Sequence, residues 1–162
     1  MMKQFFKGIG KIRYEGPDSK NPLAFKHYRA SEKVGGKSME AHLRFSVVFW
    51  HTFRGTGSDP FGGAVYDRPW DEAADPMERA EDAMRAAFEF ITKLGTPFYA
   101  WHDRDIAPEA DDLRETNRRL DRIVKLARSL QRDAGVKLLW GTSNCFSHPR
   151  FTHGAGTNPD PH

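Results

Sequence analysis

The run Phe45-Ser46-Val47-Val48-Phe49-Trp50 is short, almost unbroken in its apolar character, and rich in β-branched and aromatic residues. Such a run is typical of a strand that is covered on both faces of a sheet. Two further runs of this kind follow, at residues 97–101 and 136–140. The sequence therefore predicts strands that begin near residues 45, 97 and 136.

Two helices are predicted between these strands. Asp75-Pro76 is a helix start, because an Asp N-cap accepts a backbone N–H and a Pro at the first helical position needs no donor. Apolar residues follow at helical spacing, and the charged residues between them, Asp82 included, are expected to face outward. Gly95 ends this helix. A second amphipathic helix, with an apolar face expected to start at Leu113, ends at Gly135.

The order β-α-β-α-β predicts an α/β fold, with a parallel sheet and right-handed crossovers. Residues 1–44 are polar and irregular, and are expected to form an N-terminal arm with a short helix, followed by the α/β unit at 45–162. Asp160-Pro161 repeats the helix-start pattern, yet no helix is expected after it in these 162 residues. We therefore expect a fragment that leaves one sheet edge and one sheet face uncovered.

Composition excludes several classes of protein. The chain of 162 residues has Lys+Arg 25 against Asp+Glu 22, and this mixed charge of +3 does not favour nucleic-acid binding. Hydrophobic residues at 38% exclude a disordered chain. No run of about 18 apolar residues exists, so no membrane span is predicted. One cysteine, Cys145, and no secretory signal favour the cytoplasm.

Polar residues follow each predicted strand, where parallel α/β folds gather their reactive groups. Trp50-His51 follows the first strand, His102 to Asp105 the second, and Thr142-Ser143-Asn144 the third. A carboxylate at Asp105 could accept from one ring N–H of His102 and leave the other nitrogen for a substrate. Alternatively, Asp105 only caps backbone N–H groups of a turn. The spacing alone leaves both interpretations open.

Aromatic residues are frequent near the same strand ends. They suit the C–H side of a sugar ring, although ordinary core packing is the alternative for each one. Phe61 differs, because it stands in a Gly/Pro-rich loop and is expected to dock into another surface or subunit. The aromatic residues near the strand ends are Trp50, Phe53, Phe61, Trp101, Trp140 and Phe146.

A zinc site is not predicted. Cys145, His148 and His153 lie close in sequence, but their spacing matches no established ligand pattern and a fourth ligand is missing.

Five segments together resemble one family. Residues 13–16, 21–25 and 40–45 are similar to the amino-terminal arm of xylose isomerases of the longer-arm class. Residues 98–106 resemble that family's catalytic histidine motif, and residues 137–146 its third-strand motif. The resemblance implies a partial (β/α)8 TIM barrel consisting of the first three βα units. A complete barrel needs about 250 residues.

The resemblance also implies a reaction. The family interconverts D-xylose and D-xylulose, and often D-glucose and D-fructose, as a homotetramer. The chemistry is a hydride shift assisted by two divalent cations, Mg2+, Mn2+ or Co2+, that act as Lewis acids. The family's metal ligands and catalytic lysine lie on later strands, so the chain is expected to lack them.

Individual roles follow from the same resemblance. His102 matches the histidine that binds the ring-oxygen region and assists ring opening, and Asp105 matches the carboxylate that orients it. Trp50 and Phe146 match the apolar substrate pocket, and Thr142 matches a polar contact at the sugar's far end.

Phe61 matches the loop phenylalanine that enters a neighbouring subunit's site.

Two other functions remain open at this point. The chain could be a catalytically inactive fragment that acts as a weak sugar-binding or assembly module. A metal-dependent endonuclease would need a basic groove, which the mixed charge does not favour.

Overall fold

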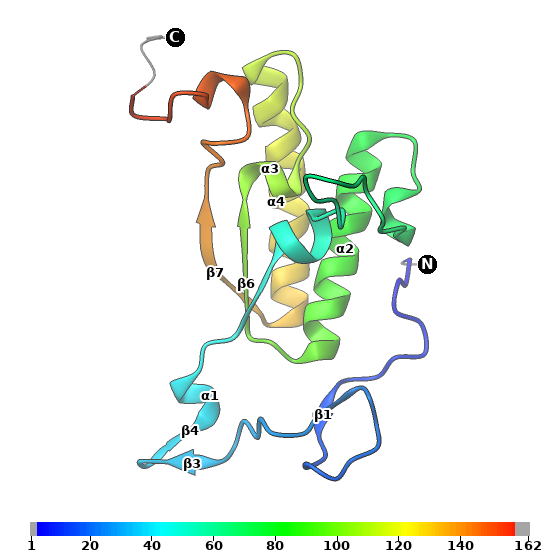
Figure 1. Ribbon diagram of the computed structural model, residues 1–162, viewed down its shortest axis with the longest axis vertical. Helices are drawn as coiled ribbons and strands as arrows, with labels where there is room; N and C mark the ends of the chain where they lie inside the picture. The colour runs from blue at the N-terminus through cyan, green and yellow to red at the C-terminus, as the bar shows by residue number, and fades with distance from the viewer. Residues whose placement is uncertain (1–2, 158–162) are drawn as a thin grey trace.

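A computed structural model describes residues 3–157 of the protein (Figure 1). Its main sheet has the order β5-β6-β7, with β5 at Ser46–Val48, β6 at Phe98–His102 and β7 at Lys137–Thr142. Both strand pairs are parallel. Helix α2 spans Pro76–Leu94 and helix α4 spans Leu113–Ala134. The predicted order β-α-β-α-β and the parallel α/β sheet are therefore confirmed, while Asp160-Pro161 lies outside the described residues.

Local chemistry sets the ends of both long helices. The Asp75 side chain accepts a hydrogen bond from the Glu78 backbone nitrogen at 2.8 Å, and Gly95 closes α2 with a φ of 78°. Helix α4 uses the same devices, an Asp112 N-cap and Gly135 with a φ of 68°. A positive φ favours glycine because it has no Cβ. The predicted ends of α2 and the predicted stop at Gly135 are thus confirmed.

The core lies between one face of the sheet and the two helices. Tyr99 on β6 packs against Phe88 of α2, with ring centroids 5.1 Å apart. The Tyr99 hydroxyl donates to Oε1 of Gln131 on α4 at 2.6 Å, and burial raises the pKa of this tyrosine to about 12. Because side chains alternate along a strand, Ala100 and His102 lie on the opposite face.

Two predictions of exposure are wrong. Asp82 is only 6% exposed, because Lys3 of the N-terminal segment reaches its carboxylate at 2.5 Å. Leu113 is 70% exposed, so the apolar face of α4 begins later than expected. The rest of that face is packed, with Ile123 and Ala127 in the core and Leu120, Val124 and Leu130 partly buried against it.

The segment after β5 departs from the predicted strand. Strand β5 ends at Val48, Phe49 adopts helical backbone angles, and a π-helical turn, η1, occupies Trp50–Arg54. The strand is therefore shorter than the apolar run at residues 45–50 that predicts it. Three further short elements occur in predicted loops: the 3-10 turn η2 at Pro69–Asp71, the short helix α3 at Asp103–Ile106 and the 3-10 turn η3 at Pro149–Phe151.

Short elements form the segment that precedes the main sheet. Strands β1, Arg13–Tyr14, and β2, Ala24–Phe25, pair in parallel. Strands β3, Lys33–Val34, and β4, Lys37–Ser38, form an antiparallel pair, followed by helix α1 at Met39–His42. Figure 1 shows these elements below the sheet and helices. The division at residue 44 stays a prediction.

The first described residues lie against α2. The Glu89 carboxylate accepts from the backbone nitrogens of Phe5 at 2.8 Å and Phe6 at 3.2 Å. Lys93 pairs with Glu89 at 2.8 Å and also donates to the Phe6 carbonyl. Both phenylalanine rings contact Trp70, with centroids about 6 Å apart. The N-terminal segment is thereby attached to α2 by one carboxylate and an aromatic cluster.

Strand β7 forms one edge of the main sheet. All of its residues are exposed, including Leu138 at 41%, Leu139 at 42% and Trp140 at 48%. Within residues 3–157, this edge and the adjoining face are uncovered. No helix in this part of the chain is long and apolar enough to cross a membrane.

Candidate active site

Three loops meet at the carboxyl ends of the main strands. His102 ends β6, and its register partner on β7 is Thr142. Turn η1, which starts at Trp50, follows β5, and the loop with Phe146 follows β7. The parallel register brings these segments to one edge of the sheet, although they are far apart in sequence (Figure 1).

His102 and Asp105 form the central pair of side chains at the carboxyl ends of the strands. Asp105 Oδ2 lies 2.9 Å from His102 Nδ1 and 2.6 Å from the His102 backbone nitrogen. The two side chains are only 12% and 10% exposed. A carboxylate that accepts from Nδ1 holds the proton there and leaves a lone pair on Nε2. The orienting contact and the capping contact, left open by the spacing, are therefore both present.

Aromatic rings surround the imidazole of His102. The ring centroids of Trp50, Trp140 and Phe146 lie 4.8, 5.4 and 5.4 Å from it. The Trp50 and Trp140 rings are also 5.4 Å apart. Such rings can cover the C–H face of a sugar and reduce the access of water. Trp140, whose register partner on β6 is Ala100, joins the pocket residues expected from the sequence.

A contact between two of the polar residues that follow the strands was not predicted. Asp103 Oδ1 accepts from the Asn144 backbone nitrogen at 2.8 Å, and this contact connects the loops after β6 and β7. Asn144 Oδ1 in turn accepts from the backbone nitrogens of Phe146 at 3.1 Å and Ser147 at 3.0 Å. No sequence pattern points to a contact between residues 41 positions apart.

A polar hollow of about 600 Å³ lies beside Asp105. Charged and hydroxyl-bearing side chains line it, among them Arg54, Ser58, Arg104 and Ser147. The hollow gives a hydrophilic ligand room next to the imidazole–carboxylate pair.

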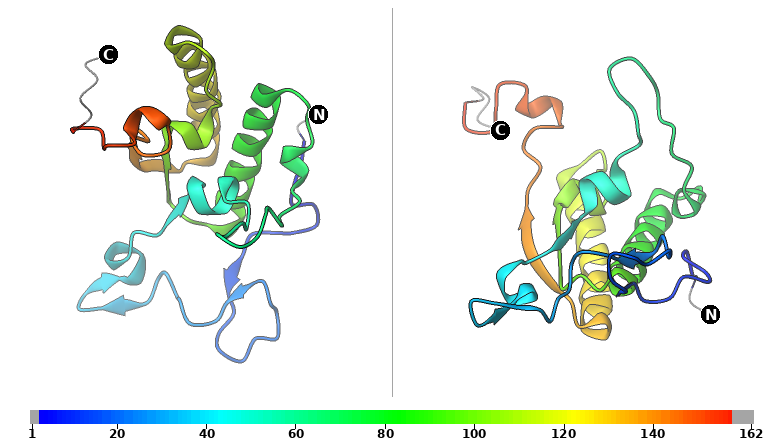
Figure 2. Two further views of the ribbon diagram at one scale, coloured as in Figure 1. Left: turned by 45° about the horizontal axis from the view of Figure 1, so that its top comes forward. Right: turned by 60° about the horizontal axis from the view of Figure 1, so that its bottom comes forward.

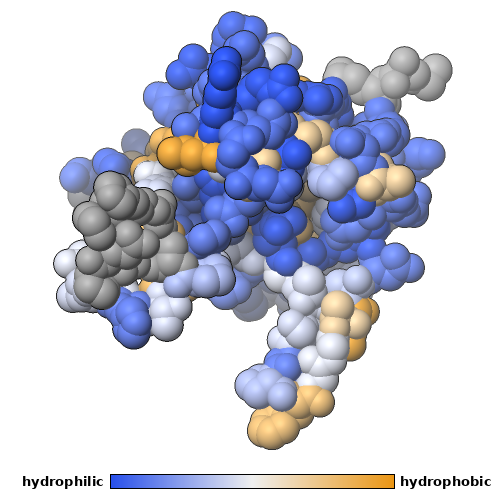
Figure 3. All heavy atoms as spheres, turned by 90° about the horizontal axis from the view of Figure 1, so that it is seen from above, coloured by the Kyte–Doolittle hydropathy of each residue, from blue (hydrophilic) through white to orange (hydrophobic). Residues whose placement is uncertain are grey.

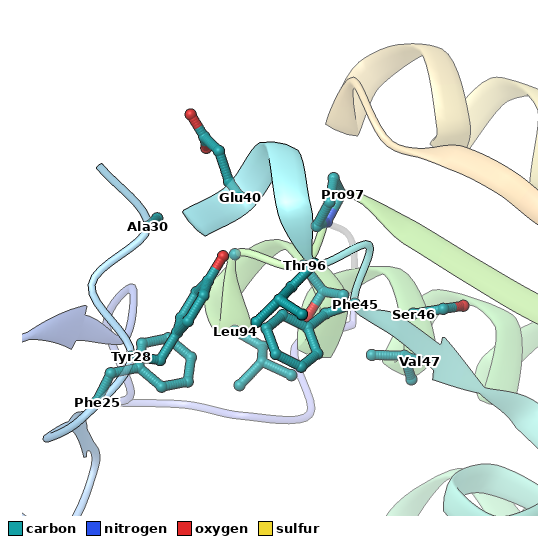
Figure 4. A pocket seen from close by; sticks show the side chains of 12 residues that line it. Phe25, Tyr28, Ala30, Glu40, Phe45, Ser46, Val47, Leu94, Thr96 and Pro97 are labelled. Carbon is teal, nitrogen blue, oxygen red and sulfur yellow. The ribbon is translucent and has the colours of Figure 1, made fainter. Parts of the chain in front are cut away.

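A second cavity, of about 320 Å³, lies near the opposite ends of the strands. Figure 4 shows the rings of Phe25, Tyr28 and Phe45 around it. Burial raises the pKa of Tyr28, and the nearby Glu40 carboxylate adds to this effect. The cavity is predominantly apolar and far along the sheet from His102, so the carboxyl ends carry the candidate site.

The structure brings most of the predicted site residues together. Trp50, Phe146 and Asp105 contact His102, and Thr142 lies opposite it in the sheet. Phe61 lies apart from them and is 98% exposed.

Phe61 stands on a loop that projects from the molecule. Asp59 pairs with Gly62 as a bridge, and the Asp59 carboxylate accepts from the Phe61 nitrogen at 2.7 Å. Lower in the loop, Val65 donates to the Thr56 carbonyl at 3.0 Å. Figure 2 shows this loop extended away from the helices, and Figure 3 shows a narrow projection with apolar residues at its tip. The loop therefore presents an aromatic side chain to its surroundings.

Comparison with known proteins agrees with the resemblance found in the motifs. No family model matches the chain. Xylose isomerase 1 of Xanthomonas campestris pv. campestris is 56% identical over 158 residues, which cover 98% of this chain and 35% of the relative. Xylose isomerases of Caldanaerobacter subterraneus subsp. yonseiensis and Thermoanaerobacterium saccharolyticum are 53% and 52% identical, over 96% and 97% of this chain.

The chain is a homologue of the xylose isomerases. It spans about a third of the length of the curated relatives that it matches, since the alignments cover 35% or 36% of them.

The family implies divalent metal ions, and the residues present can be compared with that need. Within residues 3–157, no three His, Cys, Asp or Glu side chains are placed to hold a metal ion together. Cys145 is a free, half-buried thiol. The described side chains therefore do not fit a two-cation centre.

Proposed function

We propose that the chain forms the amino-terminal part of a xylose isomerase and supplies the portion of its site that receives the cyclic sugar. The contact between His102 and Asp105, inside a group of three aromatic rings, carries this proposal. The substrates are D-xylose and D-xylulose, with D-glucose and D-fructose as further candidates.

His102 assists ring opening in this proposal. With its proton held on Nδ1 by Asp105, the imidazole has Nε2 available to take the proton of the anomeric hydroxyl. The bond between the anomeric carbon and the ring oxygen then breaks, and the imidazolium returns its Nε2 proton to the ring oxygen. The Asp105 carboxylate stabilises the imidazolium that forms between these two transfers.

The surrounding residues hold the sugar. Trp50, Trp140 and Phe146 present ring surfaces to its C–H groups, and Thr142 offers a hydroxyl to its far end. Closing this pocket against water strengthens the electrostatic contact between the imidazole and the carboxylate.

The hydride shift of the family uses two divalent cations, Mg2+, Mn2+ or Co2+, for which the described side chains are not suited. We place their ligands, and the catalytic lysine, outside this chain.

The complete protein that we propose is a (β/α)8 barrel, of which β5, β6 and β7 are the first strands. The projecting loop with Phe61 would enter a neighbouring subunit's site in a homotetramer. Its full exposure at the end of a hydrogen-bonded turn supports this arrangement. A free thiol at Cys145 supports a cytoplasmic location.

A chimera tests the proposal. Residues 1–162 replace the matching third of the Caldanaerobacter subterraneus xylose isomerase, and turnover of D-xylose is measured with Mg2+ present. We expect an active chimera, and we expect His102→Asn to lower its turnover of cyclic sugar by about 10²-fold or more. His27→Asn, at an exposed histidine of the N-terminal segment, is the matched control and should have no effect.

Two outcomes would refute the assignment. Unchanged turnover after His102→Asn would remove the proposed role of the imidazole. An inactive chimera that still binds D-xylose, detected by the fluorescence of Trp50 and Trp140, would favour the alternative of an inactive sugar-binding module.

A further inference from the structure

We infer that Asp103 is a positioning residue, which acts through Asn144 to hold the ring of Phe146 against His102. This inference rests on the proposed function, because it concerns how the sugar pocket keeps its shape. It separates Asp103 from its neighbour Asp105, which contacts the imidazole directly.

Asp103 connects two loops with one oxygen. Its Oδ1 accepts from the Arg104 backbone nitrogen at 2.8 Å and from the Asn144 backbone nitrogen at 2.8 Å. Its Oδ2 lies 3.5 Å from Nη2 of Arg104, and the side chain is 24% exposed. A partly buried oxygen that accepts two amide hydrogens fixes the two backbone segments relative to each other. The loop after β7 is thereby attached to the end of β6.

Asn144 passes this constraint to the next residues. Its Oδ1 accepts from the Phe146 and Ser147 nitrogens, and its Nδ2 donates to Ser147 Oγ at 2.7 Å. Such contacts from an asparagine to amides two and three residues ahead define a local turn. The backbone of Phe146 is therefore fixed relative to Asn144, and Asn144 relative to Asp103.

Phe146 needs this support because packing alone does not hold it. The residue is 68% exposed, so few apolar contacts restrict its ring. Its ring nevertheless meets the His102 imidazole edge to face, at 5.4 Å and an interplanar angle of 86°. For an exposed side chain, the position and direction of the backbone limit which rotamers can bring the ring to the imidazole. The chain of contacts from Asp103 to Asn144 supplies that direction.

The two aspartates that follow His102 thus have different tasks. Asp105 fixes the imidazole from one side through Nδ1. Asp103 fixes an aromatic ring on another side of the imidazole. Within residues 3–157, it makes no hydrogen bond to the imidazole itself. Together they set the distance between the base and a pocket ring, on which the position of a bound sugar depends.

The first experiment records the imidazole proton resonances of His102 in the 162-residue chain labelled at histidine. Phe146→Ala defines the change that accompanies complete loss of the ring. We expect Asp103→Ala and Asn144→Ala to shift the His102 resonances most of the way toward the Phe146→Ala values. Asp103→Asn and Asn144→Asp keep an oxygen acceptor at the same place and should restore the wild-type shifts. Asn117→Ala, at an exposed position of α4, is the control.

A double variant separates positioning from general loosening. If Asp103 acts only through Phe146, Asp103→Ala should add nothing to the shift already caused by Phe146→Ala. Additive shifts, or resonances unchanged by Asp103→Ala, would overturn the inference.

The second measurement uses the chimeric isomerase and does not depend on the behaviour of the isolated chain. We expect Asp103→Ala to lower kcat/KM for D-xylose about 10- to 100-fold, with recovery in Asp103→Asn. Equal losses in both variants would show that the charge, and not the acceptor geometry, matters, and would overturn the inference. The proposed function fails separately, if His102→Asn leaves turnover intact.

Discussion

One carboxylate oxygen of Asp105 accepts two hydrogen bonds from the same residue, at 2.9 Å from Nδ1 and 2.6 Å from the backbone nitrogen of His102. The orientation of the imidazole is therefore tied to the turn that follows β6. Any change that removes this oxygen releases the ring and the backbone together.

Replacing Asp105 should separate these two effects. Asp105→Ala leaves two partly buried N–H donors without their acceptor, which should cost about 1–3 kcal/mol of unfolding free energy. Asp105→Asn keeps an acceptor oxygen and should cost less, while it loses the charge that stabilises an imidazolium. Urea unfolding measures the unfolding free energies of the two variants. Asp111→Ala, at an exposed position, is the control, and equal costs for the Ala and Asn variants would contradict the prediction.

Glu89 should make the attachment of the N-terminal segment depend on pH. Burial raises the pKa of this carboxyl, but hydrogen bonds from Lys93 and the Phe5 and Phe6 nitrogens outweigh burial, so the pKa falls below 4.5. A depressed pKa in the folded state gives stability that is present above pH 4.5 and is lost as the pH falls through the folded value.

The wild type should therefore exceed Glu89→Gln in unfolding free energy by the largest amount near pH 6, and this difference should shrink below pH 4.5. Glu32→Gln, on the exposed surface, is the matched control. A difference that stays constant over this range of pH would disprove the role of the Glu89 charge.

Truncation of Phe53 should lower the unfolding free energy strongly, whereas truncation of Phe61 should leave it almost unchanged. Phe53 is 2% exposed and contacts three aromatic rings, so Phe53→Ala should cost about 3–5 kcal/mol. Phe61 is 98% exposed, so Phe61→Ala should change the unfolding free energy by less than about 0.5 kcal/mol. In the assembled chimera, however, Phe61→Ala should raise KM for D-xylose. Denaturant melts and steady-state kinetics test the two halves of this prediction.

Magnesium should not stabilise the isolated chain. A ligand that binds only the folded state stabilises it by RT ln(1 + [L]/Kd) and so raises Tm, and the described side chains do not fit a metal centre. We expect the same Tm in Mg2+ and in EDTA, while the chimera should melt higher in Mg2+. A magnesium-dependent rise in Tm for the chain alone would place ligands within it.

Local contacts explain which parts of the fold could be predicted. Asp75 and Gly95 act within a few residues of themselves, so the ends of α2 can be inferred from sequence. The His102–Asp105 pair is also local, three residues apart, and could be proposed from spacing. The expected apolar face of α4 is present from Leu120 onward, but its start at Leu113 lies in the first, exposed turn. The helical spacing of apolar residues does not show where along the helix the packing begins.

Long-range contacts account for what the sequence did not reveal. Asp82 has the charge of a surface residue, but it is buried and paired with Lys3, 79 positions away in the sequence. The link from Asp103 to Asn144 crosses 41 positions and has no periodic pattern. Trp50 leaves the strand because the backbone turns at Phe49, although its apolar neighbours favour a longer strand.

Strand β7 has a practical consequence for handling the protein. The exposed edge of β7, which carries Leu138, Leu139 and Trp140, can form backbone hydrogen bonds with the same edge of a second molecule. Light scattering should therefore climb steeply with concentration, even under conditions in which each molecule keeps its native helices. Dilution, rather than added stabiliser, is the remedy that this geometry recommends.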